Sequence, residues 1–506
     1  MSYLSDHIKA VLKIDPPRMA IQFEDVDWSW GDLAKVAGGL DQMLDQLGLG
    51  EAEGIGCLLR NRPPHVATIW GVIMGDRCIV TLNPVMPDDK IANDIRKMRP
   101  PVVVGARDDW ERPAIVDAAR EVGAAGIVLT GDKAKPLEWV KGLEKVGPGE
   151  HLEPLPGVAV LMLTSGTTGE PKRAPLRYQQ LELNFKRSAR ADKNWREDAP
   201  PVLKEDITLS FSPLVHISGM YFAISQGVEG RRIRLLERFS VDQWVKAVKE
   251  LQLKAAGGPP TVLKMILDAD IPKEDLASLV QLGSGTAGIK PEIVDQFVER
   301  YGLPVLSTYG ATEFAGAVCG WSLSNFNKYW KAKRGSAGRM HPGVEARTVD
   351  PETGEPLPVN TPGLLELKSA VIGDGENWVR TADLARVDED HFLFILGRAD
   401  NAIIRGGFKV HPDEVVKAME QHPAIREASV VGIPDARLGH VPVAAYIVRE
   451  GAEAPSDSEL SAFLRETLTP YQVPVRFKQV TELPRTPSLK VSMPGVRAMF
   501  ETEDAA

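Results

Sequence analysis

The chain has 506 residues, of which 43% are hydrophobic and 25% are charged, and its formal net charge is −9. This composition is that of a globular protein, and it excludes a disordered chain or a small disulfide-stapled domain. At roughly 150 residues per domain, the length predicts about three domains. The acidic balance argues against a nucleic-acid-binding protein, whose surface is normally basic. The 45 glycines and 38 prolines exceed their usual share and indicate many shaped loops.

Cysteine usage and hydropathy bear on the compartment. The three cysteines form no CxxC pair, which favours free thiols in a reducing environment. The first twenty residues carry several charges and lack the apolar stretch of a signal peptide. The longest uncharged run, 207–228, contains Pro213, His216 and four serines, so we expect no membrane span there. We therefore expect a soluble, cytoplasmic protein.

The N-terminal region alternates short apolar runs with segments of helical periodicity. Helices are predicted at 63–74, which has prolines in its first turn, and at 88–98, which has apolar residues along one face. Strands are predicted at 54–59, 78–82 and 102–105. Repeated strand–helix units favour a parallel sheet that is covered by helices. The fold class predicted for this part is α/β.

A domain boundary is predicted near residue 400. Residues 383–398 are predicted to form two strands around an acidic turn. After them the pattern predicts a helix from Pro412, strands at 428–433 and 441–448, and a further helix after Ser456, which has capping-box spacing to Glu459. We divide the chain into a large α/β part of several subdomains, 1–399, and a small, mobile α+β part, 400–506.

The most informative segment, LTSGTTGEPK, runs from Leu163 to Lys172 directly after an apolar run. Its two glycines, four hydroxyls and lysine suit a polyphosphate, because backbone and hydroxyl donors can surround phosphate oxygens. It differs from the GxxxxGK[ST] loop, because neither Ser nor Thr follows Lys172. We expect this segment to hold phosphates.

A second glycine-rich segment, 283–288, matches GxGxxG literally. A dinucleotide fingerprint requires a helix to open there and an acidic residue about twenty positions further on. Pro291 instead restarts the chain, and residues 303–308 are LPVLST. We expect a glycine-rich edge against a flat ligand here and no NAD site.

Six segments between residues 160 and 490 together resemble the adenylate-forming superfamily, which includes acyl-CoA synthetases, adenylation domains of peptide synthetases and luciferases. They occur in the family's order: TSGTTGEPK at 164–172, YGATE at 309–313, RTAD at 380–383, GRAD at 397–400, GGFKV at 406–410 and PRTPSLK at 484–490. The resemblance implies an AMP-forming acid–CoA ligase. Such an enzyme joins a carboxylate to ATP with Mg²⁺, releases pyrophosphate, and passes the acyl group to the thiol of coenzyme A.

The resemblance also implies roles in nucleotide binding. Thr312 is expected at the α-phosphate and Glu313 at Mg²⁺, which prefers hard oxygen ligands. Tyr309 is expected to stack on adenine, and Asp383 to bind the ribose hydroxyls with help from Arg398. The remaining nucleotide-binding residues are expected to be Thr164, Ser165, Gly166, Thr167, Thr168, Gly169, Lys172, Gly285, Thr286, Ala287 and Gly310.

Within the C-terminal part, the resemblance makes Lys490 the catalytic lysine that bridges the attacking carboxylate and the α-phosphate. Asp400 occupies the hinge position about which the small domain rotates between the two half-reactions. The residues expected to line the channel for CoA are Gly406, Gly407, Phe408 and Lys409.

The resemblance places His216 at the entrance for the substrate carboxylate. Further acyl-pocket residues are expected to be Met220, the loop at 283–285, Gly310, Phe314, Ala315 and Gly316. The small residues leave room for a bulky or elongated acid. These small residues do not choose between a ring and a chain. The His216 segment and the compact set of pocket residues favour an aromatic or alicyclic acid, and a medium- or long-chain fatty acid stays open.

Some positions depart from the family pattern. Leu489 stands where a glycine usually precedes the lysine, and Ala382 replaces a usual glycine before Asp383. Two other functions stay open at this point: a stand-alone adenylating enzyme that loads a carrier protein, and a non-catalytic nucleotide sensor. The expected partners are the small-molecule acid, ATP and CoA, with neither nucleic acid nor membrane, and a homodimer is possible because many relatives are dimers.

Overall fold

The computed structural model describes residues 2–164, 172–189, 196, 199–373, 375–405, 408–435, 437–486 and 489–501, without the side chains of Thr164, Asp400 and Lys409. These residues form two compact units. The first contains the described residues among 1–165, 171–330 and 369–377, and the second those among 331–368 and 378–506. The predicted boundary at residue 400 stays a prediction.

A seven-stranded sheet forms much of the first unit. Its strands, in spatial order, are β7 (Leu137–Trp139), β6 (Ala125–Leu129), β5 (Val102–Ala106), β3 (Gly54–Leu58), β4 (Cys78–Leu82), β8 (Val158–Thr164) and β9 (Lys172–Arg177). The five central strands are parallel and the two edge strands are antiparallel to their neighbours. The predicted strands at 54–59, 78–82 and 102–105 therefore exist, and they are neighbours in one parallel sheet.

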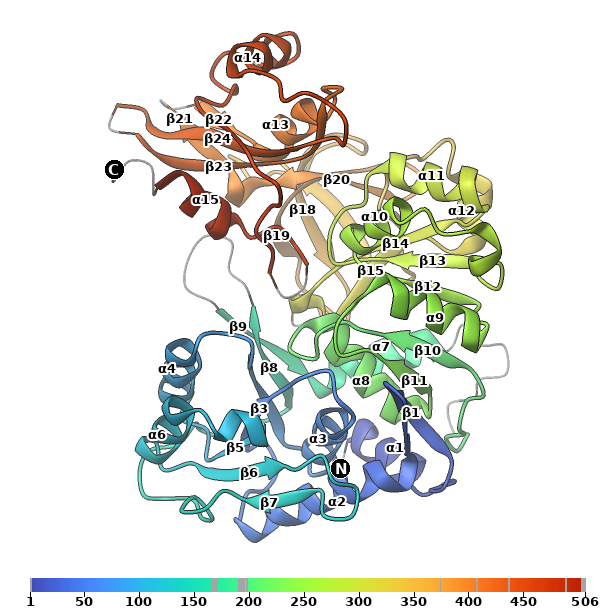
Figure 1. Ribbon diagram of the computed structural model, residues 1–506, viewed down its shortest axis with the longest axis vertical. Helices are drawn as coiled ribbons and strands as arrows, with labels where there is room; N and C mark the ends of the chain where they lie inside the picture. The colour runs from blue at the N-terminus through green and yellow to red at the C-terminus, as the bar shows by residue number, and fades with distance from the viewer. Residues whose placement is uncertain are drawn as a thin grey trace. The chain divides into compact units, whose positions relative to one another are not determined.

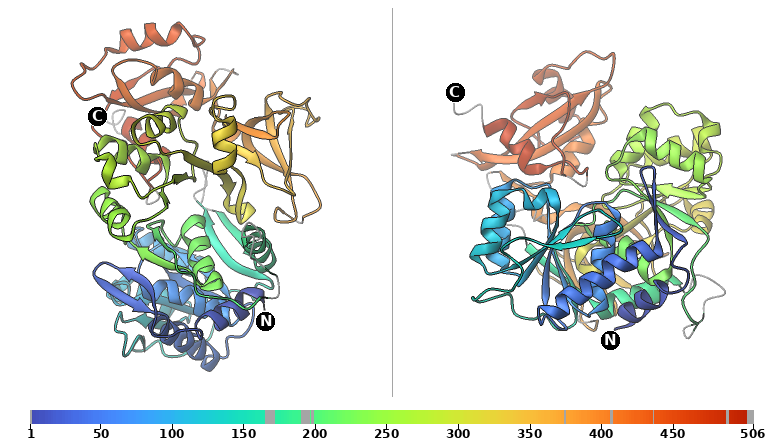
Figure 2. Two further views of the ribbon diagram at one scale, coloured as in Figure 1. Left: turned by 90° about the vertical axis from the view of Figure 1, so that its right-hand side faces the viewer. Right: turned by 60° about the horizontal axis from the view of Figure 1, so that its bottom comes forward.

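Helices cover both faces of this sheet (Figures 1 and 2). Because side chains alternate along a strand, Val102 and Val104 pack with α2 (Trp30–Gln46) and α3 (Pro63–Met74). Val103 faces the other way, and packs with α4 (Asp88–Met98) and α6 (Pro113–Glu121). Double coverage explains why these strands are continuous apolar runs.

Two further groups of strands belong to the first unit. One is a sheet in the order β10 (Ile207–Ser210), β11 (Arg232–Leu235), β1 (Met19–Phe23) and β2 (Val26–Ser29). The other runs β12 (Ala255–Gly257), β13 (Gln281–Ser284), β14 (Val305–Ala311) and β15 (Gly316–Gly320). The remaining helices of this unit are α1 (Tyr3–Val11), α5 (Arg107–Trp110), α7 (Tyr178–Ala189), α8 (Ile217–Glu229), α9 (Val241–Leu251), α10 (Pro260–Asp268), η1 (Lys273–Leu276), α11 (Pro291–Tyr301), η2 (Thr312–Phe314) and α12 (Leu323–Tyr329).

The second unit begins with strands in the order β16 (Gly338–Met340), β20 (Phe392–Arg398), β19 (Val379–Val387), β18 (Gly363–Lys368) and β17 (Glu345–Val349). The short helix η3 (Ala399–Asn401) follows β20. The C-terminal sheet contains β22 (Phe408–Val410), β21 (Ile403–Arg405), β24 (Gly439–Val448) and β23 (Ile425–Asp435), with β25 (Phe477–Gln479) beside β24.

The C-terminal sheet is also covered on both faces (Figure 1). Val430 packs with α13 (Pro412–Met419) and α14 (Asp457–Arg465), and its neighbour Val431 packs with α15 (Met493–Glu501). The N-cap of α14 is Ser456, whose side chain accepts a hydrogen bond from the Glu459 amide, as the sequence predicts. The predicted fold class, a large α/β part with covered sheets and a small α+β part, is confirmed.

Candidate functional site

The segment YGATE lies where β14 ends and η2 begins. β14 and β15 form an antiparallel pair in which Gly310 faces Ala317. A Cβ at Gly310 would lie 2.4 Å from the carbonyl oxygen of Gly316, so no larger residue fits there. This close approach presents Thr312 and the exposed Glu313 on η2, directly after the strand.

The glycine-rich segment after β13 lies beside this hairpin. β13 and β14 are parallel, with Ser284 opposite Ser307, so both strands end at the same edge. A Cβ at Gly285 would lie 3.1 Å from Oγ1 of Thr308, which directly precedes Tyr309. The structure therefore brings Gly285, Thr286 and Ala287 to the edge where Tyr309 lies. The next helix begins only at Pro291, as expected for a segment that is no dinucleotide fingerprint.

The described ends of the predicted phosphate segment are adjacent. Thr164 at the end of β8 pairs with Lys172 at the start of β9, and Lys172 is exposed. Ser165, Gly166, Thr167, Thr168 and Gly169 lie outside the described residues, so their predicted contacts with phosphate stay predictions.

His216 immediately precedes α8, in a turn that a distant asparagine holds. The amide nitrogen of Asn61 donates to the carbonyl oxygen of Ser212 at 3.1 Å, and its amide oxygen accepts from the N–H of Leu214 at 3.1 Å. Asn61 is only 5% exposed. The loop after β3 thus fixes the turn that leads to His216.

The predicted acyl-pocket residues differ in how deeply they are buried. Met220, Phe314 and Ala315 are buried, whereas Gly316 is partly exposed. Ala315 has φ +50°, in the left-handed region. The side chain of Asn184 on α7 donates to the carbonyl oxygen of Ala315 at 3.2 Å, so α7 holds this part of the wall.

In the second unit, antiparallel pairing brings Asp383 and Arg398 together. They are register partners in β19 and β20, and Nη1 of Arg398 lies 4.0 Å from Oδ1 of Asp383. Gly397 has φ +146°, and a Cβ there would lie 2.8 Å from a carboxylate oxygen of Asp413. Glycine is therefore required immediately before Arg398. The predicted cooperation of Asp383 and Arg398 at a ribose is consistent with this proximity.

Lys490 lies in the same unit and is hydrogen-bonded to Thr486. The N–H of Thr486 donates to the carbonyl oxygen of Lys490 at 2.7 Å. Arg485, next to Thr486, is anchored to β23, because its guanidinium donates to both carboxylate oxygens of Glu427 at 3.0 and 2.9 Å. Lys490 is exposed as a residue, but neighbouring groups displace solvent from around its ammonium group. This desolvation lowers the pKa of Lys490, and the like charge of Arg398 lowers it further.

The segment GGFKV joins β21 and β22. These strands pair antiparallel, with Arg405 opposite Phe408. Phe408 is 57% exposed and its ring stacks on Tyr471 at 4.7 Å. Gly406 and Gly407 lie outside the described residues, as do the side chains of Lys409 and of Asp400, whose backbone lies in η3.

Magnesium is the metal that the resemblance implies. Among the described residues there is no group of three or more His, Cys, Asp or Glu side chains that suits a metal ion. An exposed carboxylate such as Glu313 nevertheless fits Mg²⁺, which takes one or two carboxylates and completes its shell with phosphate oxygens and waters. The residues present therefore suit a magnesium ion that binds together with a nucleotide.

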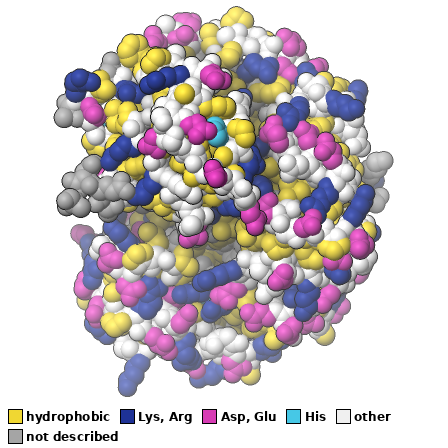
Figure 3. Space-filling model, turned by 45° about the horizontal axis from the view of Figure 1, so that its top comes forward, with side chains coloured by type: hydrophobic (Ala, Val, Ile, Leu, Met, Phe, Trp, Pro, Cys, Tyr) yellow, Lys and Arg dark blue, Asp and Glu magenta, His cyan; other side chains and the backbone are white. Residues whose placement is uncertain are grey.

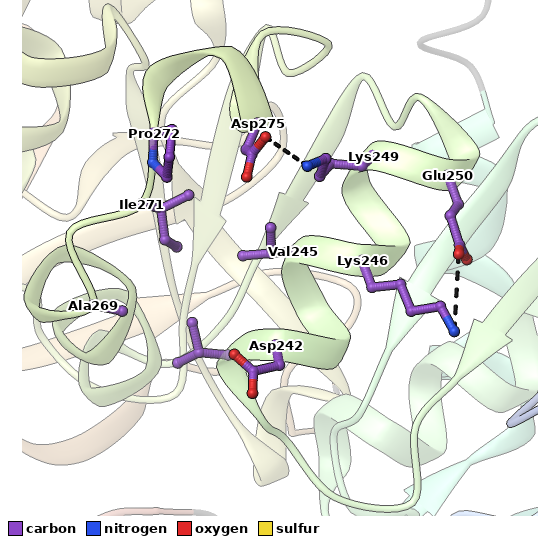
Figure 4. Close-up of a pocket in the computed structure, with 10 residues that line it drawn as sticks. Asp242, Val245, Lys246, Lys249, Glu250, Ala269, Ile271, Pro272 and Asp275 are labelled. Carbon is purple, nitrogen blue, oxygen red and sulfur yellow. Dashed lines mark ion pairs between the residues drawn. The ribbon is translucent and has the colours of Figure 1, made fainter.

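Two other surface features concern the charged side chains of the described residues. Acidic and basic side chains are interspersed on the face that Figure 3 shows. A hollow of about 470 Å³ lies between α9 and η1 (Figure 4). Four of its charged side chains form two ion pairs, Lys249 with Asp275 at 2.7 Å and Lys246 with Glu250 at 3.8 Å, and Asp242 also lines it. No described helix has the length and apolar character needed to traverse a bilayer.

Comparison with known proteins identifies the family. The model of the AMP-binding enzyme family matches residues 9–375, and that of the AMP-binding enzyme C-terminal domain matches residues 414–490. The chain belongs to the AMP-binding enzyme family, which confirms the resemblance seen in the six segments.

Similar proteins cover nearly the whole chain. The 2-succinylbenzoate–CoA ligase of Bacillus pumilus is 28% identical, over 94% of each chain. The long-chain-fatty-acid–CoA ligase of Bacillus subtilis is 26% identical, over 93% of this chain and 90% of its own. The solved structure of o-succinylbenzoate CoA synthetase from Bacillus subtilis with ATP and a magnesium ion has a TM-score of 0.75 at 23% identity, and the alignment covers 97% of this chain and 98% of that one. This last likeness supports the fold.

Several residues that shape the site have no signal in the sequence motifs. Asn61, Asn184 and Glu427 lie far along the chain from the residues they hold. Glu366 is another example: it is buried between Arg347 and Arg380, with Nε···O distances of 2.8 and 3.0 Å. Only the polar character of these residues inside apolar surroundings hints at such roles.

Proposed function

We propose that this protein is an AMP-forming acid–CoA ligase that acts on an aromatic or alicyclic carboxylic acid. The observation that carries this proposal is the match of one chain to both the AMP-binding model and its C-terminal domain model. Relatives that cover more than nine-tenths of the chain are named CoA ligases, and one of them is named for an aromatic acid. A fatty acid is the second candidate substrate, because the other relative is named for one.

The first half-reaction is formation of the acyl-adenylate. A carboxylate oxygen of the acid attacks the α-phosphorus of ATP, and the bond to pyrophosphate breaks. In this proposal, Thr312 donates to the α-phosphate and Lys490 places its ammonium between carboxylate and phosphate, where negative charge develops. Bound Mg²⁺ would be held by Glu313 and would neutralise phosphate charge. Asp383 and Arg398 would orient the ribose, and Tyr309 would stack on adenine with Gly285, Thr286 and Ala287 along its edge.

The second half-reaction is thioester formation. The sulfur of CoA attacks the acyl carbon, the carbon–oxygen bond to AMP breaks, and the thiol proton passes to solvent. Rotation about Asp400 would withdraw Lys490 and bring the β21–β22 hairpin to the thiol, with Phe408 on the channel wall. Support for this comes from the exposed ring of Phe408 and its stacking on Tyr471, which presents a flat apolar surface.

The proposed compartment is the cytoplasm. All three cysteines lie among the described residues, are buried and form no disulfide, and burial raises the pKa of Cys78 and of Cys319 to about 12. Such thiols are poor nucleophiles and suit a reducing environment. A homodimer stays a prediction, which the mass measured by light scattering after gel filtration will test.

The test of function is a panel of aromatic, alicyclic and fatty acids. We expect acid-dependent exchange of labelled pyrophosphate into ATP, and thioester formation with free CoA. Exchange without thioester formation would indicate a carrier-loading enzyme. Nucleotide binding without exchange for any acid would indicate a sensor and would contradict the proposal.

A further inference from the structure

Arg187 is a half-buried cation, and no carboxylate among the described residues pairs with it. It lies on α7, and its Nη2 donates to Oδ1 of Asn184 at 2.7 Å and to the carbonyl oxygen of Ala317 at 2.9 Å. Both acceptors are neutral. Among the residues that the structure describes, no carboxylate forms an ion pair with Arg187, whereas its neighbour Lys186 pairs with Glu182 at 2.9 Å.

A half-buried cation without an anion beside it is costly. Removing a charge from water is unfavourable unless an opposite charge and hydrogen bonds replace the solvent. Burial lowers the pKa of Arg187, and the nearby Tyr221 only partly opposes this effect. The guanidinium has five N–H donors in a planar fork, and its Nε and Nη1 make no hydrogen bond within the described part of the chain.

Tyr221 supplies a second hydrogen-bond donor near Arg187. It lies on α8, one residue after Met220, and its ring packs on Phe185 at 4.7 Å. Its hydroxyl makes no hydrogen bond to any described residue. Burial raises its pKa, so the hydroxyl is a neutral donor at physiological pH. Arg187 and Tyr221 are both partly exposed, so a small ligand can reach them.

The position of this pair connects it to the acyl site. Nη2 of Arg187 contacts β15 at Ala317, one residue beyond the expected pocket residues Ala315 and Gly316. Asn184, which accepts from Arg187, itself donates to Ala315. The pair therefore adjoins the wall that would bound the acyl group.

We propose that Arg187 and Tyr221 bind a second carboxylate on the acid substrate, so that the enzyme selects dicarboxylic over monocarboxylic acids. This inference rests on the proposed function, which assigns the first carboxylate to the reaction with ATP. A guanidinium fork matches a carboxylate in two parallel hydrogen bonds, and the tyrosine hydroxyl supplies a third donor. An aromatic acid that carries a carboxylate on a side chain satisfies both the acyl pocket and this pair.

The experiment compares matched acids that differ only in the distal carboxylate: phenylalkanoates with and without a ring carboxylate, and straight-chain acids with and without a terminal one. Hydrogen bonds to a charged group are worth about 1.5–3 kcal/mol, which corresponds to roughly 10- to 100-fold in kcat/KM. We expect the wild type to prefer the dicarboxylate of at least one pair by about that factor. Arg187→Met should reduce this ratio of kcat/KM values by about the same factor, Arg187→Lys by less, and Tyr221→Phe by about 3- to 10-fold.

The control variant is Lys186→Met, which removes a positive charge from the same helix and should leave the ratio unchanged. If Arg187→Met lowers kcat/KM equally for both acids of a pair, Arg187 has a structural role and the proposal is overturned. The proposal is also overturned if the wild type prefers the dicarboxylate in none of the pairs. Binding is measured separately as the shift in Tm that each acid causes. If no acid supports turnover, the proposed function fails. The carboxylate site would still be supported if a dicarboxylate raises the Tm of the wild type and leaves the Tm of Arg187→Met and of Tyr221→Phe unchanged. If the dicarboxylate shifts the Tm of all three proteins equally, the carboxylate site is overturned.

Discussion

The side chain of Asn61 accepts a hydrogen bond from the backbone N–H of Leu214 at 3.1 Å, across 153 residues of sequence. Together with its bond to Ser212, this contact fixes the turn that ends at His216. The position of the proposed carboxylate entrance therefore depends on a residue at the end of a different strand–helix unit.

Asn61→Ala should loosen this turn. We expect the KM for the acid to rise about 10-fold with a smaller change in kcat, because the turn positions a binding residue and not the reacting phosphate. Loss of buried hydrogen bonds should also lower the free energy of unfolding by about 1–3 kcal/mol. Steady-state kinetics and urea unfolding measure the two effects, and the exposed Asn327→Ala is the control. An unchanged KM for the acid, with stability reduced, would show that the clamp is structural only.

Lys490→Ala should separate the two half-reactions. Removing the ammonium should slow adenylation about 10²- to 10³-fold, the size typical of a lost electrostatic contact to developing charge. Transfer from supplied acyl-AMP to CoA should change little. Because the charged form is the active one and the pKa of Lys490 is lowered, adenylation should decline with rising pH before an ordinary lysine, of pKa 10.5, would lose its proton. Equal loss in both half-reactions would contradict the assigned role.

Glu313→Gln should alter the response to magnesium. An amide oxygen is a weaker ligand for Mg²⁺ than a carboxylate, so the magnesium concentration for half-maximal pyrophosphate release should rise about 10-fold. Titration with MgCl₂ at saturating ATP measures this. The control is Glu355→Gln, at an exposed position of the second unit. A magnesium curve identical to that of the wild type would rule out the assignment.

Leu489→Gly should relieve backbone strain beside Lys490. Leu489 has φ +62°, in the left-handed region that costs a non-glycine residue about 1–2 kcal/mol. The departure from the family's usual glycine is therefore a strained position. We expect Leu489→Gly to keep or raise Tm, and Leu489→Val to lower it, because β-branched residues tolerate this region least. Calorimetry provides the test, and the reverse order would contradict it.

Glu366→Gln should destabilise the second unit in a pH-dependent manner. Burial by itself would raise the pKa of Glu366, but hydrogen bonds and charges from Arg347 and Arg380 outweigh burial and lower it. Because the pKa is lower in the folded state, the ionised Glu366 stabilises the folded protein at pH values above its unfolded-state pKa, near 4.5. This stabilisation is lost as the pH falls through the folded-state pKa. At pH 7 the variant should lose about 3 kcal/mol, as expected when one partner of a buried ion pair is removed. The difference from the wild type should shrink below about pH 4, and a constant difference down to pH 3 would contradict this origin.

Local sequence determined much of the fold. The strands at 54–58, 78–82 and 102–106 and the helices at 63–74 and 88–98 follow from apolar runs, periodicity and proline placement, which act over a few residues. The family also follows from the sequence, because six short motifs in fixed order depend on residue identity alone. The helix-free segment 285–290 was likewise predictable, since Pro291 marks where the next helix can begin.

Tertiary structure decided how these pieces support one another. Asn61 accepts from Leu214, Glu427 accepts from Arg485, and Arg187 donates to Ala317, and each of these contacts joins residues from separate elements. No local pattern encodes such pairings, because each depends on which strands become neighbours and which face a side chain takes. The sequence by itself thus determined the family and the chemistry of the motifs. The folded chain decided which polar groups meet, and it set Arg187, which pairs with no described carboxylate, against Ala317 of β15.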